Sequence, residues 1–74
     1  MSDVTKPTNI IEGITNEIIR VMAIKTECLA IPGGAGTFAA LMMQAAIDNA
    51  RAAQASGDIM LMIPAYKALK EFEL

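Results

Sequence analysis

A short segment, Ile31–Phe38, interrupts two long stretches of helical sequence pattern. Within five residues it contains a proline and three glycines. Proline lacks a backbone N–H and disfavours a helical conformation in the residue before it, and glycine reaches positive φ values that other residues avoid. One helix is therefore expected to end near Ile31, and another to begin after the glycines with Gly36 or Thr37 as its N-cap.

The residues before this segment predict a first helix over about Asn9–Ile31. Its apolar residues recur at helical spacing, and they are Ile10, Ile11, Ile14, Ile18, Val21, Met22, Ile24, Cys28, Leu29 and Ile31. Asn9 and Glu12 match a capping box, so the helix is expected to begin at Asn9, and residues 1–8 are expected to form a flexible tail. Gly13 is expected to mark a close helix crossing.

The residues after the segment predict a second helix over about Phe38–Ser56. Its alanine-rich face is expected to pack against the first helix, because small side chains let two backbones approach closely. That face consists of Leu41, Met42, Ala45, Ala46, Asn49, Ala52 and Ala53. Asn49 is expected to form a hydrogen bond across this contact. Met43, Ile47 and Ala50 lie to the other side of the helix and are expected to meet another subunit.

A third helix is expected over about Ile59–Phe72. Gly57 suits the left-handed position that ends the second helix, and Asp58 suits the N-cap of the third. Pro64 leaves two alternatives open, because proline within a helix removes a hydrogen bond and clashes with the preceding turn. Either the helix kinks at Pro64, or the chain first forms an irregular turn and the helix begins near Pro64.

The hydrophobic content of the chain predicts self-association. Of its 74 residues 54% are hydrophobic, and a chain this short has too little interior to bury so many apolar side chains. We therefore expect a single all-α domain, a helical hairpin with a short C-terminal helix, that assembles as a homo-oligomer. The expected subunit contacts are Met43, Ile47 and the all-apolar segment Ile59–Ile63.

Charge and residue content exclude several classes of function. The net charge of −2 argues against double-stranded nucleic acid as a partner. The lack of histidine excludes most zinc sites and every histidine-dependent triad, so no catalytic residue, metal or cofactor is expected. The single cysteine, Cys28, excludes an internal disulfide and suits the cytoplasm. Residues 28–47 carry no charge, but the proline and glycines divide them, which favours two helix ends over a membrane span.

The glycine-rich segment allows two interpretations. In the first, backbone N–H groups at the start of the second helix bind an anion. The expected ligand-binding residues are Gly33, Gly34, Ala35 and Gly36 through their N–H groups, Thr37 through its hydroxyl, Phe38 or Tyr66 by stacking, and Lys25 or Arg20 as a countercharge. In the second interpretation the glycines serve only the turn. Lys25 likewise either lies at the edge of the apolar face or points toward a ligand.

Two parts of the chain, Pro32–Phe38 and Ala52–Tyr66, carry a resemblance to a known class of proteins. With Gln54-Ala55-Ser56-Gly57-Asp58 ending the long helix, they resemble small phage-encoded helical proteins. These include the viral sponges that sequester cyclic nucleotide signals of bacterial antiviral immunity as helical-hairpin oligomers. The resemblance is one of architecture, and it implies sequestration of a ligand between subunits.

These observations lead to two functional hypotheses. The chain is either a non-enzymatic protein that binds a small anionic or nucleotide-type ligand at the glycine-rich segment, or a module that captures a partner protein through exposed apolar surface. Substitutions of Thr37 and Lys25 test the first hypothesis, and substitution of Met60 tests the second.

Overall fold

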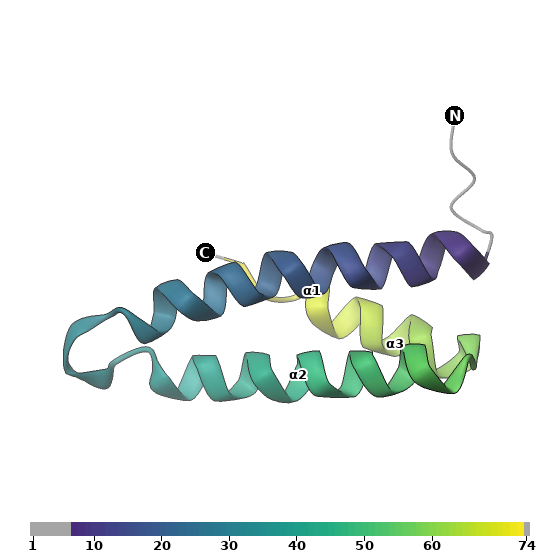
Figure 1. The fold of residues 1–74 in the computed structure, drawn as a ribbon. Coiled ribbons are helices and arrows are strands. Elements are labelled where there is room, and N and C mark those ends of the chain that lie inside the picture. Colours follow the sequence, from purple (N-terminus) through teal and green to yellow (C-terminus); the bar gives the residue numbers. More distant parts are fainter. Residues whose placement is uncertain (1–6, 74) are drawn as a thin grey trace.

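The computed structural model describes residues 7–73, which form three α-helices. Helices α1 (Pro7–Leu29) and α2 (Thr37–Ser56) run antiparallel, side by side, and a short 3-10 turn, η1 (Pro32–Gly34), lies between them (Figure 1). Helix α3 (Ile59–Lys70) turns back from the end of α2 and packs against both. The expected all-α fold is confirmed, and no strand occurs between residues 7 and 73.

The start of α1 differs from the sequence expectation. The helix begins at Pro7, so Asn9 lies inside it and the predicted capping box at Asn9 is wrong. Proline is favoured in the first turn of a helix, because its missing N–H has no helical partner there. Of the expected tail, residues 1–6 lie outside the described residues, whereas Pro7 and Thr8 already belong to α1.

The core is a single cluster to which all three helices contribute. Its fully buried large side chains include one from each helix, namely Ile14 of α1, Ile47 of α2 and Leu69 of α3. The other buried members of the cluster are Ile18, Val21, Ile24, Met43, Ala50, Ala53, Met62 and Ala65. Because each helix buries one apolar stripe against the other two, the expected third helix completes the core.

The face of α2 that packs inward is only partly the one expected, because Ala53 is buried and Ala46 half-buried as predicted, but Ala50 from the other side is buried too. Met43 and Ile47 are buried within the chain, so the prediction that they contact another subunit is wrong. Leu41 and Met42 are 64% and 51% exposed, and Asn49, expected to bond across the helix pair, is exposed as well. The physical reason is packing, since Met43 and Ile47 fill the space between α1 and α3 in the core cluster.

Helix α3 begins at Ile59 and continues through Pro64 to Lys70, so the alternative of a start near Pro64 is wrong. Gly57 ends α2 in the left-handed conformation, and the Asp58 carboxylate accepts a 2.9 Å hydrogen bond from the Met60 N–H, both as expected. Pro64 is exposed and close to the start of the helix. It has no N–H to donate to the carbonyl four residues before it, and water can reach that carbonyl at the protein surface.

A matched pair of isoleucine substitutions tests the position of the core. Ile47 is fully buried and Ile19 is 63% exposed. We expect Ile47→Ala to lower the free energy of unfolding by about 2–5 kcal/mol, because it leaves a cavity between three helices. The same change at Ile19 should stay within about 0.5 kcal/mol. Urea denaturation followed by circular dichroism measures both, and equal effects would place Ile47 outside the core.

Candidate functional site

The turn between α1 and α2 is closed tightly by backbone hydrogen bonds. The N–H of Ala30 donates to the carbonyls of Thr26 and Glu27, and the N–H of Ile31 donates to that of Cys28. These bonds satisfy carbonyls that the end of a helix leaves without partners. The connection between α1 and α2 is therefore joined by hydrogen bonds to the C-terminal end of α1.

The glycines of the turn each meet a steric or conformational demand. Gly33 and Gly34 have φ values of 79° and 73°, a left-handed region that costs other residues free energy. Gly36 is buried, and a Cβ placed on it would lie 2.1 Å from the carbonyl oxygen of Cys28. Backbone conformation and packing against α1 thus explain why glycine occupies these three positions, and no ligand is needed for that explanation.

The first turn of α2 is open at the protein surface. Gly36 is its N-cap, so Thr37 is the first helical residue, and no side chain of the described residues caps the helix. The first turn contains no acidic residue, and Phe38 next to it is 74% exposed. The turn therefore presents exposed residues Gly33, Gly34 and Ala35 together with the Thr37 hydroxyl and the Phe38 ring, whereas Gly36 is buried against α1.

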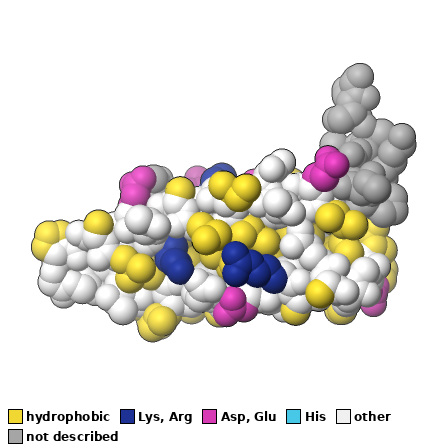
Figure 2. All heavy atoms as spheres, in the orientation of Figure 1, with side chains coloured by type: hydrophobic (Ala, Val, Ile, Leu, Met, Phe, Trp, Pro, Cys, Tyr) yellow, Lys and Arg dark blue, Asp and Glu magenta, His cyan; other side chains and the backbone are white. Residues whose placement is uncertain are grey.

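Lys25 is bound to the side of α2. Its ammonium donates to Gln44 Oε1 at 2.5 Å, and Gln44 Nε2 donates to Asp48 Oδ1 at 2.8 Å. Gln44 follows Thr37 by seven residues, which is about 10 Å along a helix. Lys and Arg side chains lie across the middle of Figure 2, with hydrophobic side chains around them. Within one chain, Lys25 serves the α1–α2 contact.

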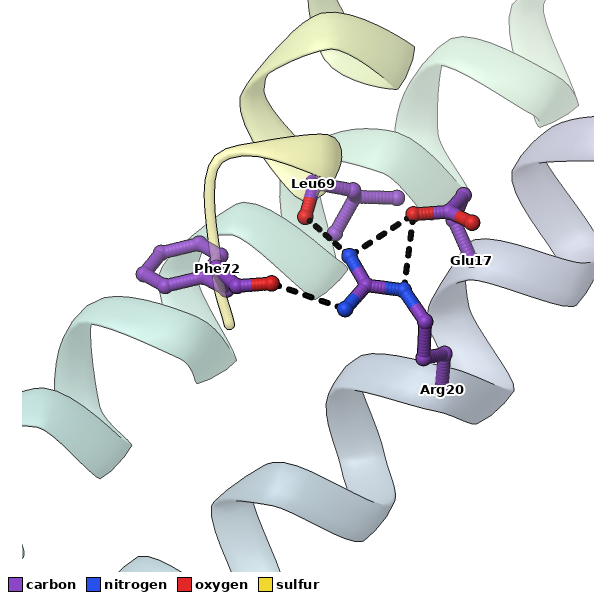
Figure 3. Close-up of polar contacts among 4 residues, drawn as sticks. All are labelled: Glu17, Arg20, Leu69 and Phe72. Carbon is purple, nitrogen blue, oxygen red and sulfur yellow. Dashed lines mark hydrogen bonds and ion pairs between the residues drawn. The ribbon is translucent and has the colours of Figure 1, made fainter. Parts of the chain in front are cut away.

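Arg20 holds the end of α3 against α1 (Figure 3). Its guanidinium donates to the carbonyl of Phe72 at 2.7 Å and to that of Leu69 at 3.0 Å. The same group pairs with Glu17 on the preceding turn, with two contacts of 2.8 and 3.0 Å to Oε1. A cation is favourable at the C-terminal end of a helix, and here it also supplies donors for terminal carbonyls. Arg20 therefore has a structural role far along the chain from the turn.

Tyr66 lies against the first half of α1. A Cβ on Gly13 would be 3.2 Å from Tyr66 Cε1, so the glycine makes room for the tyrosine ring. The three atoms nearest to that Cβ all belong to the ring, so Gly13 marks a side-chain contact with α3 and not the close approach of two helix backbones. The ammonium of Lys70 lies 5.3 Å from the centre of the same ring. Tyr66 and Arg20 are thus occupied in the packing of α3, and one chain does not bring them to the turn.

A different surface includes Met60, which the partner-capture hypothesis already named, and adds two lysines that the sequence analysis did not assign to binding. Met60, Ile63, Lys67 and Lys70 are all exposed and share one stripe of α3, at spacings of three and four residues. We call this stripe the α3 outer face. The signal was present in the spacing, but Ile59–Ile63 was interpreted as an oligomer contact because nothing in the sequence says which of its sides is covered.

Comparison with known proteins adds no further assignment. No protein family model, curated protein or solved structure matches the chain. Among residues 7–73 no group of three or more metal-ligating side chains gathers. None of the helices in that range has the combination of length and hydrophobicity that crossing a membrane requires.

Three glycine substitutions test the steric account of the turn. Gly33→Ala should cost about 1–2 kcal/mol of unfolding free energy, because only its left-handed φ opposes a side chain and no atom lies near. Gly33→Asn should cost less, since asparagine tolerates that conformation. Gly36→Ala should cost more than either, because the new methyl meets backbone. Thermal unfolding gives the order, and a harmless Gly36→Ala would contradict the close packing.

Proposed function

We propose that this chain is a small, non-enzymatic helical module that binds a partner protein through the α3 outer face. The observation that carries the proposal is the exposure of large apolar side chains at the start of α3, where Met60 is 73% and Ile63 39% exposed. Apolar groups gathered on a surface next to polar ones are typical of protein contacts.

The chemistry of the α3 outer face defines the kind of partner. Its first half is apolar and its second half carries Lys67 and Lys70, both exposed. Tyr66 lies beneath the ammonium of Lys70 and helps to place it. A matching partner offers apolar side chains for Met60 and Ile63, followed by carboxylates for the two lysines. Such an arrangement occurs on an amphipathic helix with acidic residues at one end.

Substitution of Met60 by aspartate tests this function. Met60 is the second residue of α3, where a negative charge is favourable, so the fold should be retained. We expect Met60→Asp to reduce capture of the partner from cells that express the protein by at least about 10-fold, which is typical for loss of a central contact. Quantitative mass spectrometry of the captured proteins measures the effect. In a separate test, high salt should weaken partner binding, because it screens the charges of the two lysines.

A matched control accompanies this measurement. Asn16→Asp adds the same charge to an exposed position of α1, and it should leave capture unchanged. Circular dichroism verifies that both variants keep their helices. Equal capture by wild type and by Met60→Asp would refute the α3 outer face as the binding surface.

The open start of α2 supports a second candidate, binding of a small anionic or nucleotide-type ligand at the turn. No side chain among residues 10–73 caps this helix, and its first turn is free of acidic residues. Backbone N–H groups at such a terminus favour anions. The Thr37 hydroxyl and the exposed Phe38 ring would add a polar contact and a stacking face.

Native mass spectrometry of the protein purified from expressing cells tests the second candidate. A retained ligand should appear as extra mass that disappears on denaturation, and Thr37→Ala should remove it without changing the fold. Thr26→Ala, on the exposed side of α1, is the matched control and should keep the ligand. Adduct-free spectra, with no binding of added phosphate or cyclic dinucleotide, would refute this candidate.

A further inference from the structure

The side of α2 that faces away from the core carries a regular, uncharged stripe. Its exposed members follow one another at alternating spacings of four and three residues, and they are Phe38, Met42, Ala45, Asn49, Ala52 and Ser56. We call this stripe the α2 outer face. Spacings of four and three residues are those of a helix that packs along its length against another helix. No other element of residues 7–73 covers it.

We propose that the α2 outer face binds the α2 outer face of a second copy of this chain, with the two helices antiparallel. The sizes of the side chains carry the argument. The two largest ones, Phe38 and Met42, lie at the start of the stripe, and the four that follow are all smaller. The bulk of the stripe is therefore concentrated at its N-terminal end.

An antiparallel second copy compensates this uneven distribution of bulk. Phe38 of one chain then lies beside Ser56 of the other, Met42 beside Ala52, and Ala45 beside Asn49, so each layer combines a larger with a smaller side chain. A two-fold axis repeats every pair twice, as a symmetric dimer requires. A parallel pair would place two phenylalanines at one end and two serines at the other, which would force the helices apart.

Charge and area are consistent with a second copy of this chain. The stripe has no charged residue, so two copies meet without burying a charge, and Asp48 beside it remains at the solvent-exposed edge. α2 has 20 residues and is about 30 Å long. A strip of about 30 by 10 Å per copy is less than half of the ~800 Å² of a standard interface, so the dimer is weak and depends on concentration.

The dimer adds to the proposed function and uses a different surface. Each copy keeps its α3 outer face, so one dimer presents two partner-binding faces. Two linked faces increase the apparent affinity for a partner that carries two target segments. Because the two faces share no residue, a variant of one leaves the side chains of the other unchanged, and the dimer and the partner binding can be tested independently.

Analytical ultracentrifugation of the full chain tests the dimer, from about 1 µM to about 1 mM, a range that covers weak association. We expect the mass to rise from 7.9 kDa toward twice that value. Ala45→Glu should keep the chain monomeric throughout, since it places a carboxylate in the middle of the contact. Ala23→Glu, the same change at an exposed position of α1, should behave like wild type. A wild-type chain that stays monomeric at 1 mM, or Ala45→Glu that dimerises normally, would overturn the proposal.

Cysteine crosslinking tests the orientation. In a Cys28→Ala background, chains with Met42→Cys should form disulfides with chains carrying Ala52→Cys in preference to their own kind. Preferential self-linking of Met42→Cys chains would indicate a parallel pair and overturn the antiparallel one. Met60→Asp should leave the dimer intact, so a loss of partner capture in that variant reports on the α3 outer face alone.

Discussion

The burial of one apolar stripe from each of three helices is the constraint on which the structure depends. Ile14, Ile47 and Leu69 are each inaccessible to solvent, and each comes from a different helix. Helix α3 is short, with 12 residues, and its end is held by the guanidinium of Arg20, which donates to two carbonyls there. Without this contact the Phe72 carbonyl would lose the donor that Arg20 supplies, whereas the Leu69 carbonyl would keep the N–H groups of Glu71 and Phe72. The polar clamp and the apolar core therefore support each other.

The steric demands of the turn change the interpretation of the glycine-rich segment. Gly33 and Gly34 are required by their left-handed φ values, and Gly36 by its contact with the carbonyl of Cys28. These demands follow from the need to reverse the chain within a few residues, so the glycine pattern alone does not distinguish a turn from an anion site. Two of the expected site residues, Arg20 and Tyr66, are also committed to packing α3. This is why the α3 outer face supports the proposed function better than the turn does.

Local chemistry explains which expectations from the sequence are confirmed. The helices α2 and α3 begin or end within a few residues of the expected positions, and the Gly57–Asp58 connection has the predicted cap. Such signals depend on neighbouring residues only, as does the breaking of helices at Pro32. The start of α1 was predicted wrongly because Pro7 and Asn9 both suit a helix start. The capping pattern alone does not show at which of the two residues the helix begins. Among the expected site residues, those of the continuous segment 33–38 lie together. Arg20 and Tyr66, which are distant from it in the sequence, do not join them.

The sequence by itself determined that the chain is helical and that it turns at Ile31–Phe38, because backbone conformation depends on neighbouring residues. Only the tertiary structure decided which face of α2 is inside. Both faces of that helix are apolar, and the choice depends on how well Met43 and Ile47 fit between α1 and α3. Packing thereby placed the stripe from Phe38 to Ser56 on the surface. The same packing committed Arg20 and Lys25 to helix contacts, since a side chain's partners depend on the helices that surround it.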